Sequence, residues 1–157
     1  MQLYVVAVGK LRPALRQAGD DYLRRLRRFI AVSEREVREA GRAGSVERQR
    51  DEEARHLLDA MPADADVVLV DQGGNPWSSE ELAAQLDAWR VAARDVALVI
   101  GGAVGVAASV GERARARWSL GPMTLPHELA RVIVMEQLYR ASTILRGEPY
   151  HRGERSA

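Results

Sequence analysis

The chain has 157 residues, of which 46% are hydrophobic, so its size and apolar content are those of one domain with one core. It has a net charge of +1, no cysteine and three histidines, which excludes disulfides and disfavours a metal site. The apolar run at the start is too short for a signal sequence, and no run reaches the roughly 18 residues of a membrane span. We therefore expect residues 1–157 to form a single soluble, cytoplasmic domain without a metal.

The first half of the chain predicts two strands and two helices in alternation. Residues 3–8 are a β-rich apolar run that is typical of a strand covered on both faces. Apolar positions recur at helical spacing over 13–30, and several arginines flank them. A weak strand is expected at 32–38. A second helix is expected at about 46–61, and Pro62 would end it.

The second half repeats this alternation more clearly. An apolar strand at 67–71 precedes a helix whose start is marked by the capping-box pair Ser78 and Glu81. The next strand, 96–100, leads directly into a glycine-rich segment that begins at Gly101.

The last part of the chain predicts a short helix, a brief strand at 118–120, a loop, and a long helix at 127–146 that Gly147 caps. Strands that alternate with helices indicate an α/β fold with a mostly parallel sheet and helices on both faces.

Three loops at the carboxyl ends of strands are candidate walls of a ligand pocket, because open α/β sheets bind ligands at that edge. They follow residues 71, 100 and 120, and all are rich in glycine or proline. The glycines of 101–105 would let main-chain atoms approach a ligand closely. Their spacing is not G-x-G-x-x-G, and there is no phosphate-binding G-x-x-x-x-G-K-[ST] segment, which disfavours a nucleotide triphosphatase.

Charge is distributed unevenly along the sequence. The net charge is +6 for residues 1–50, −8 for 51–100 and +3 for 101–157, and all but one of the basic residues are arginines. Arginine suits contacts with phosphate, but a GC-rich genome produces the same bias. Charge alone therefore does not establish RNA binding.

Four motifs together resemble one known family. They are Val-Ile-Gly-Gly-x-x-Gly at 99–105, Trp-Ser-Leu-Gly-Pro-Met-Thr-Leu-Pro-His at 118–127, Glu-Gln-Leu-Tyr-Arg-Ala at 136–141, and Arg-Gly-Glu-Pro-Tyr-His-Arg at 146–152. The chain resembles the RlmH family of ribosomal RNA large-subunit (pseudouridine-N3) methyltransferases, of the α/β-knot (SPOUT) class. The resemblance covers essentially the whole chain. It implies methylation of the pseudouridine N3 position in 23S ribosomal RNA, on assembled ribosomes.

The resemblance also implies a C-terminal trefoil knot, which general rules of chain topology would exclude as a rare exception. It implies that S-adenosyl-L-methionine is the cofactor and that the three loops hold it. The implied cofactor-binding residues are Val70, Gly101, Gly102, Gly105, Leu120, Gly121, Pro122, Met123, Thr124 and Leu125.

The family acts as a homodimer, and the helix at 127–146 is the implied interface. This helix has a wide apolar arc that a partner could cover, although burial within one chain would explain the same pattern. The arc consists of Leu129, Val132, Ile133, Val134, Met135, Leu138, Ile144 and Leu145.

Methyl transfer to pseudouridine requires the acceptor nitrogen to lose a proton, so a base or a cation near the forming anion would help. The candidates are Arg140, Tyr150, His151 and Arg152. Because Gly147 and Pro149 end the last helix, we expect the tail from Tyr150 to be free to meet RNA. His127 is more simply explained as a residue that caps the helix or shapes the loop.

Two other functions remain open at this point. One is a dinucleotide-binding, dehydrogenase-like domain, and the other is a ribosome-binding module without catalysis. Binding of S-adenosylmethionine or of NAD would separate the first from the methyltransferase, and methyl incorporation into ribosomes would separate the second.

Overall fold

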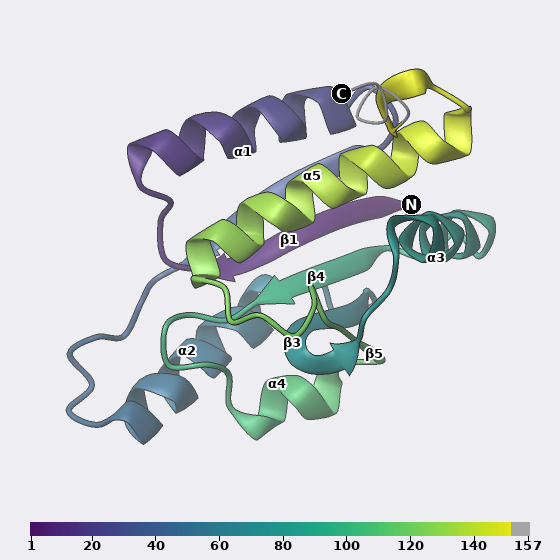
Figure 1. The fold of residues 1–157 in the computed structure, drawn as a ribbon. Helices are drawn as coiled ribbons and strands as arrows, with labels where there is room; N and C mark the ends of the chain where they lie inside the picture. Colours follow the sequence, from purple (N-terminus) through teal and green to yellow (C-terminus); the bar gives the residue numbers. More distant parts are fainter. Residues whose placement is uncertain (152–157) are drawn as a thin grey trace.

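The structure is a computed structural model that describes residues 1–151, and for His151 only the backbone. Strands and helices alternate along it, in an order that Figure 1 shows from purple to yellow. The elements are β1 (Gln2–Val8), α1 (Pro13–Leu26), β2 (Ala31–Val37), α2 (Val46–Ala60), β3 (Asp66–Asn75), α3 (Ser79–Val91), β4 (Val96–Ile100), α4 (Ala108–Arg113), β5 (Ala116–Trp118), α5 (His127–Arg146) and a 3-10 turn, η1 (Pro149–His151).

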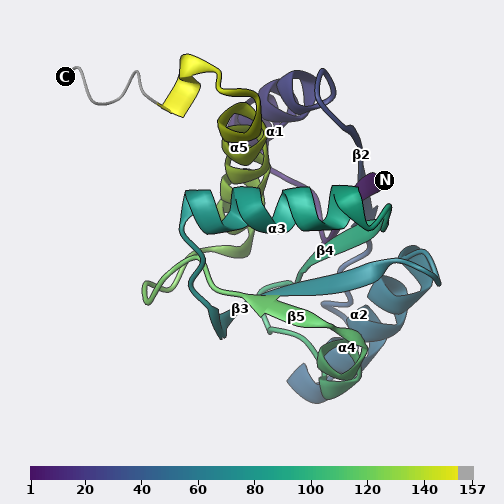
Figure 2. The same ribbon diagram turned by 90° about the vertical axis from the view of Figure 1, so that its right-hand side faces the viewer.

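The described strands form one parallel sheet with the order β2-β1-β4-β3-β5. Helices α1, α3 and α5 cover one face, and α2 and α4 cover the other (Figures 1 and 2). Each face has its own buried cluster: Leu3, Val5 and Leu98 point toward α5, and Val6, Val67 and Val99 point toward α2. The predicted α/β class, with a parallel sheet between two helical layers, is confirmed.

Several local signals were interpreted correctly. Ser78 caps α3 in a reciprocal capping box with Glu81, because its side chain accepts from the Glu81 amide while the Glu81 carboxylate accepts from the Ser78 amide. Gly147 ends α5 in the left-handed region at φ 68°, where glycine carries no steric penalty.

Helix α1 is shorter than predicted, because it ends at Leu26 and not at residue 30. After Leu26 the chain tightens into turns: the Arg28 amide bonds to the Arg25 carbonyl at 3.2 Å, and the Phe29 amide bonds to the Leu26 carbonyl at 2.9 Å. Ile30 can then pack against the core at the start of β2.

The edge formed by β3 and β5 also differs from the prediction. β3 does not end at residue 71 but continues to Asn75, which pairs with Trp118 after an irregularity in the register. β5 lies at Ala116–Trp118, two residues before the predicted strand. A Cβ on Gly74 would lie 2.6 Å from the Arg117 carbonyl carbon, so only glycine permits this close passage. Because this pairing joins two segments far apart in the sequence, neither segment shows a pattern of apolar residues that predicts it.

Candidate functional site

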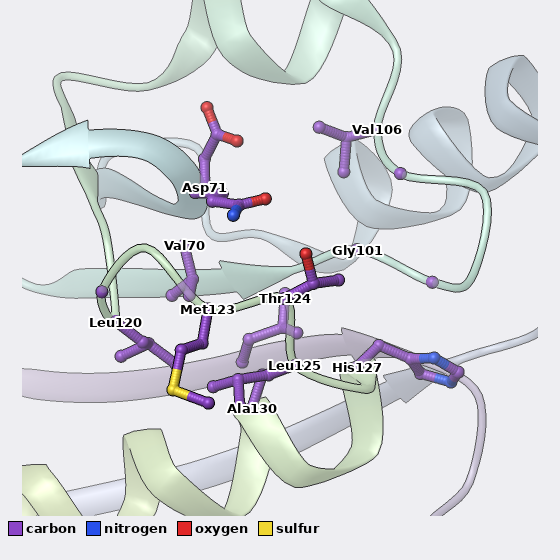
Figure 3. A pocket seen from close by; sticks show the side chains of 15 residues that line it. Val70, Asp71, Gly101, Val106, Leu120, Met123, Thr124, Leu125, His127 and Ala130 are labelled. Atoms are coloured by element: carbon purple, nitrogen blue, oxygen red, sulfur yellow. The ribbon is translucent and has the colours of Figure 1, made fainter.

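A cavity of about 210 Å³ lies at the carboxyl edge of the sheet, where β3 and β4 end and the segment between β5 and α5 passes over them (Figure 3). All the predicted cofactor-binding residues except Pro122 line it. Pro122 does not line the cavity but contacts a residue that does, because its carbonyl accepts a hydrogen bond from Nε2 of Gln72 at 2.8 Å. The lining residues are Val70, Asp71, Gln72, Ile100, Gly101, Gly102, Gly105, Val106, Leu120, Gly121, Met123, Thr124, Leu125, His127 and Ala130.

The glycine loop, residues 101–105, forms one wall of the cavity. A Cβ on Gly101 would lie 2.7 Å from Cγ1 of Val106, which leaves no room for a side chain. Gly105 has φ +78° and donates its amide to the Gly102 carbonyl at 3.1 Å. The loop therefore presents main chain to the cavity, as the sequence predicted.

The opposite wall is the segment between β5 and α5, residues 119–126. Gly121 adopts φ +119°, and its amide donates to Oγ of Ser119 at 3.1 Å. Leu120 and Leu125 contribute apolar surface to the cavity, and Thr124 contributes a hydroxyl. Met123 is 77% exposed, so it can move without a packing penalty.

Sequence reasoning missed the polar side of the cavity. Asp71 and Gln72 line it, and the Asp71 carboxylate accepts a hydrogen bond from Nη1 of Arg117 at 3.2 Å. Asp71 is predicted from the sequence to lie at the end of a strand. Because ligands bind at the carboxyl ends of parallel strands, a carboxylate at that position already indicates a ligand-binding residue. His127 lines the cavity and does not cap α5, since Pro126 is the N-cap and no side chain bonds there.

Of the predicted catalytic residues, Arg140 and Tyr150 do not line this cavity. Arg140 donates to Oε1 of Glu136 at 2.7 Å, and the Tyr150 hydroxyl donates to the same oxygen at 3.0 Å. The Tyr150 ring meets the Tyr139 ring at 4.6 Å in an edge arrangement. Burial and the negative charge of Glu136 raise the pKa of the Tyr150 hydroxyl. The expectation that Tyr150 is free to leave the domain was wrong, because it packs on α5; Arg152 lies outside the described residues.

Most of the predicted apolar arc of α5 is also accounted for within the chain. Val132, Val134, Met135 and Leu138 are buried between the sheet and helices α1 and α3, so they offer no surface to a partner. Leu129 and Ile133, one helical turn apart, remain half-exposed.

A buried arginine fixes the first turns of α5 against the sheet. Arg131 is fully buried, and its Nη2 donates to the carbonyls of Val8 at 3.0 Å and Gly9 at 2.9 Å. Its Nη1 donates to Glu36 at 2.6 Å and to Glu34 at 3.2 Å. Because Ala130 and His127 line the cavity, this network also sets the position of one cavity wall.

Residues 1–151 lack the features of a metal site and of a membrane-spanning helix. No group of three or more His, Cys, Asp or Glu side chains could hold a metal ion there. None of the described helices is long and apolar enough to cross a membrane.

A family model described as "Predicted SPOUT methyltransferase" matches residues 1–151. The chain belongs to the SPOUT methyltransferase family. The predicted family, enzyme class and cofactor, S-adenosylmethionine, are thereby confirmed.

Similar proteins agree with this assignment. The SPOUT chain is 53% identical over 152 residues to "Ribosomal RNA large subunit methyltransferase H" of Rubrobacter xylanophilus. The matched region covers 94% of this chain and 96% of the relative. It is 42% identical to the protein of the same name from Xanthomonas campestris, over 97% of this chain and 99% of the relative. Its fold is similar to "a probable methylase family protein" from Haemophilus influenzae, with a TM-score of 0.54 and 12% identity over 94% of this chain and 69% of that one.

The cavity of this SPOUT protein fits such a cofactor in three respects. Gly101, Gly102 and Gly105 present main chain, without side chains, to the cavity. Leu120, Leu125 and Ile100 offer an apolar surface, and Asp71 offers a carboxylate for a hydroxyl or a cationic group.

Proposed function

We propose that this protein transfers a methyl group from S-adenosylmethionine to N3 of a pseudouridine in 23S ribosomal RNA, on assembled ribosomes. One observation carries the proposal: the middle of β3, the glycine loop and the segment before α5 meet around one cavity, and a Cβ on Gly101 there would lie 2.7 Å from Val106. The names of relatives 53% and 42% identical to this chain support ribosomal RNA as the substrate.

S-adenosylmethionine supplies a methyl group on a sulfonium, whose thioether leaving group is neutral and stable. The protein must align the acceptor with the methyl group and exclude water. In our proposal the main chain at Gly101 and Gly102 and the segment from Leu120 to Leu125 hold the cofactor, while the open side of the cavity receives the base. Asp71 and Gln72 orient polar groups of the cofactor.

The acceptor nitrogen lies between two carbonyl groups and is weakly acidic, so a cation that stabilises its anion helps the reaction. Tyr150 is a poor base at neutral pH, because its raised pKa keeps the hydroxyl protonated. We assign to Tyr150 the role of an aromatic contact or hydrogen-bond donor for the substrate. His151, Arg152 and Arg140 remain the candidates for the base and for the stabilising cation.

In this proposal Arg140 needs a second chain to reach a cavity. Arg140 follows His127 by 13 residues on one helix, roughly 20 Å at a rise of about 1.5 Å per residue, so it lies far from the cavity of its own chain. We therefore propose a homodimer in which the tail of one protomer completes the cavity of its partner. Leu129 and Ile133, half-exposed on α5, would form part of the interface.

We also propose that the C-terminal segment is threaded through a loop to form a trefoil knot. Membership of the SPOUT family supports this threading. If the knot is present, amides of the carboxyl-terminal segment should exchange hydrogen more slowly than those of α1, and the segment should resist proteolysis better than α1.

Two experiments test the proposed function. Calorimetry should detect binding of S-adenosylmethionine and not of NAD, whereas NAD binding would favour a dehydrogenase-like domain. Tritium should pass from labelled S-adenosylmethionine to ribosomes from a strain that lacks the gene. Ribosome binding without transfer would instead indicate a module that has lost catalysis.

A further inference from the structure

A buried carboxylate with one oxygen unpaired lies directly behind the glycine loop. Glu53 belongs to α2, on the face of the sheet opposite α5 (Figure 1), and is only 1% exposed. Its Oε1 accepts from the Ala40 amide at 3.0 Å and from Nε2 of Gln49 at 2.9 Å. Its Oε2 has no hydrogen-bond partner among the described residues.

The unpaired oxygen is aimed at the glycine loop. A Cβ built on Gly102 would lie 3.2 Å from Oε2 of Glu53 and 3.0 Å from Cγ1 of Val8. The loop backbone thus rests on the carboxylate from one side while Gly102 lines the cavity on the other. Oε2 of Glu53 is therefore an acceptor without a donor beside the main chain of Gly102.

A second residue of α2, Arg50, also contacts the glycine loop. Nε of Arg50, about one turn before Glu53, donates to the Val104 carbonyl at 2.9 Å. Arg50 thereby fixes an acceptor of the loop, and Glu53 offers an acceptor to the loop's donors. One hydrogen bond from Arg50 and the Glu53 carboxylate behind Gly102 thus face the segment 101–105 from the same helix.

Stability alone does not explain a glutamate at this position. Removing a carboxylate from water is costly unless its lone pairs are used, and here one oxygen is left without a donor. A neutral glutamine has the same shape and could keep both bonds to Ala40 and Gln49 through its carbonyl oxygen. A buried carboxylate with one oxygen unpaired beside the glycine loop points to a role in cofactor binding.

We propose that Glu53 is a positioning residue for the cofactor loop: in the cofactor-bound protein its Oε2 accepts a main-chain N–H from Gly102 or Ala103. The bond holds the glycine loop in its cofactor-binding conformation, and Glu53 itself does not touch the cofactor. The inference rests on the proposed function, because it takes the cavity lined by Gly101 and Gly102 as the S-adenosylmethionine site.

The test is Glu53→Gln, with Asp51→Asn as a matched control that makes the same charge change at an exposed site of α2. The Kd for S-adenosylmethionine, measured by calorimetry, should rise about tenfold in Glu53→Gln through loss of one charge-assisted hydrogen bond. The KM for S-adenosylmethionine should rise with it, and kcat at saturating cofactor and the KM for ribosomes should stay near the parent values. The Tm should not fall, because the amide is easier to bury than an unpaired carboxylate.

A purely structural role would lower the Tm and move all kinetic constants together, and either that result or an unchanged Kd would overturn the proposal. If Glu53→Gln does not fold, hydrogen exchange of single amides in the parent protein tests the proposed bond instead. The Gly102 or Ala103 amide should become protected only when S-adenosylmethionine is added, and continued rapid exchange of both would refute the bond. Failure of the parent to bind S-adenosylmethionine would instead contradict the proposed function.

Discussion

The Tyr150 hydroxyl donates to Glu136 at 3.0 Å, which anchors the first residue of the tail to the middle of α5. We expect the tail to serve the RNA substrate and not the cofactor. Deletion of residues 150–157 should abolish methylation of ribosomes while the Kd for S-adenosylmethionine changes by no more than about twofold. Deletion of 153–157 alone, the control, should keep activity. A truncated protein that methylates at the parent rate would place the base at Arg140 or in the segment before α5, and weaker cofactor binding would show that the tail closes the cavity.

The glycine wall of the cavity should not tolerate a side chain. Gly101→Val should abolish measurable binding of S-adenosylmethionine, because even the Cβ would lie 2.7 Å from Val106. Gly41→Val is the matched control, since a Cβ there meets nothing within 4 Å. Calorimetry measures binding, and far-UV circular dichroism confirms that both variants fold. Parent-like affinity in Gly101→Val would remove the loop from the cofactor site.

The buried Arg131 should dominate the stability of the contact between α5 and the sheet. Arg131→Met leaves Glu36 and two main-chain carbonyls without a buried donor, which should reduce the free energy of unfolding by about 3 kcal/mol. Arg12→Met, which removes a pair whose arginine side chain is 63% exposed, should cost less than about 1 kcal/mol. Urea denaturation measures both losses. Equal losses of unfolding free energy in the two variants would show that the burial of Arg131 adds nothing to the stability of the fold.

Asp66, at the start of β3, predicts an acid-dependent part of the stability. Hydrogen bonds from Arg94 and the positive charge of the nearby Arg115 lower the pKa of the Asp66 carboxyl below the ordinary value of 3.8. A lowered pKa stabilises the fold above pH 3.8, and this contribution disappears as the pH falls through the folded-state value. Asp66→Asn should therefore be less stable than the parent at pH 7 in urea, with a gap that closes in acid. A gap that is independent of pH would contradict the ion pair.

The proposed dimer should depend on Leu129 and Ile133 of α5. Sedimentation at micromolar concentration should give one species at twice the chain mass. Ile133→Glu should shift it to monomer and abolish methylation, because the tail would no longer reach a partner's cavity. Val91→Glu, at a 73% exposed site on α3, should remain dimeric. A monomer with full activity would refute both the interface and the shared cavity.

The sequence predicted well those features that have local causes. The apolar runs at 67–71 and 96–100 located the central strands, and the glycines after them located one wall of the cavity. The Ser78 capping box and Gly147 marked helix ends, because capping depends on a few neighbouring residues.

Features that depend on distant contacts were not predictable in this way. The extension of β3 to Asn75 depends on pairing with Trp118, more than 40 residues away. Arg131 and Glu53 have charged side chains in amphipathic helices and look like surface positions until β2 and the loop at 38–45 cover them. The docking of Tyr150 on Tyr139 likewise depends on how the chain returns along α5 after Gly147.

The most direct test of the central claim is the identity of the modified nucleoside. Ribosomes from a strain without the gene are incubated with the purified protein and S-adenosylmethionine, and the nucleosides of 23S ribosomal RNA are then separated and analysed by mass spectrometry. We predict the appearance of 3-methylpseudouridine, at one site, in the parent reaction and its absence with Gly101→Val. A methyl group on another base or on a ribose, or none with the parent protein, would contradict the account.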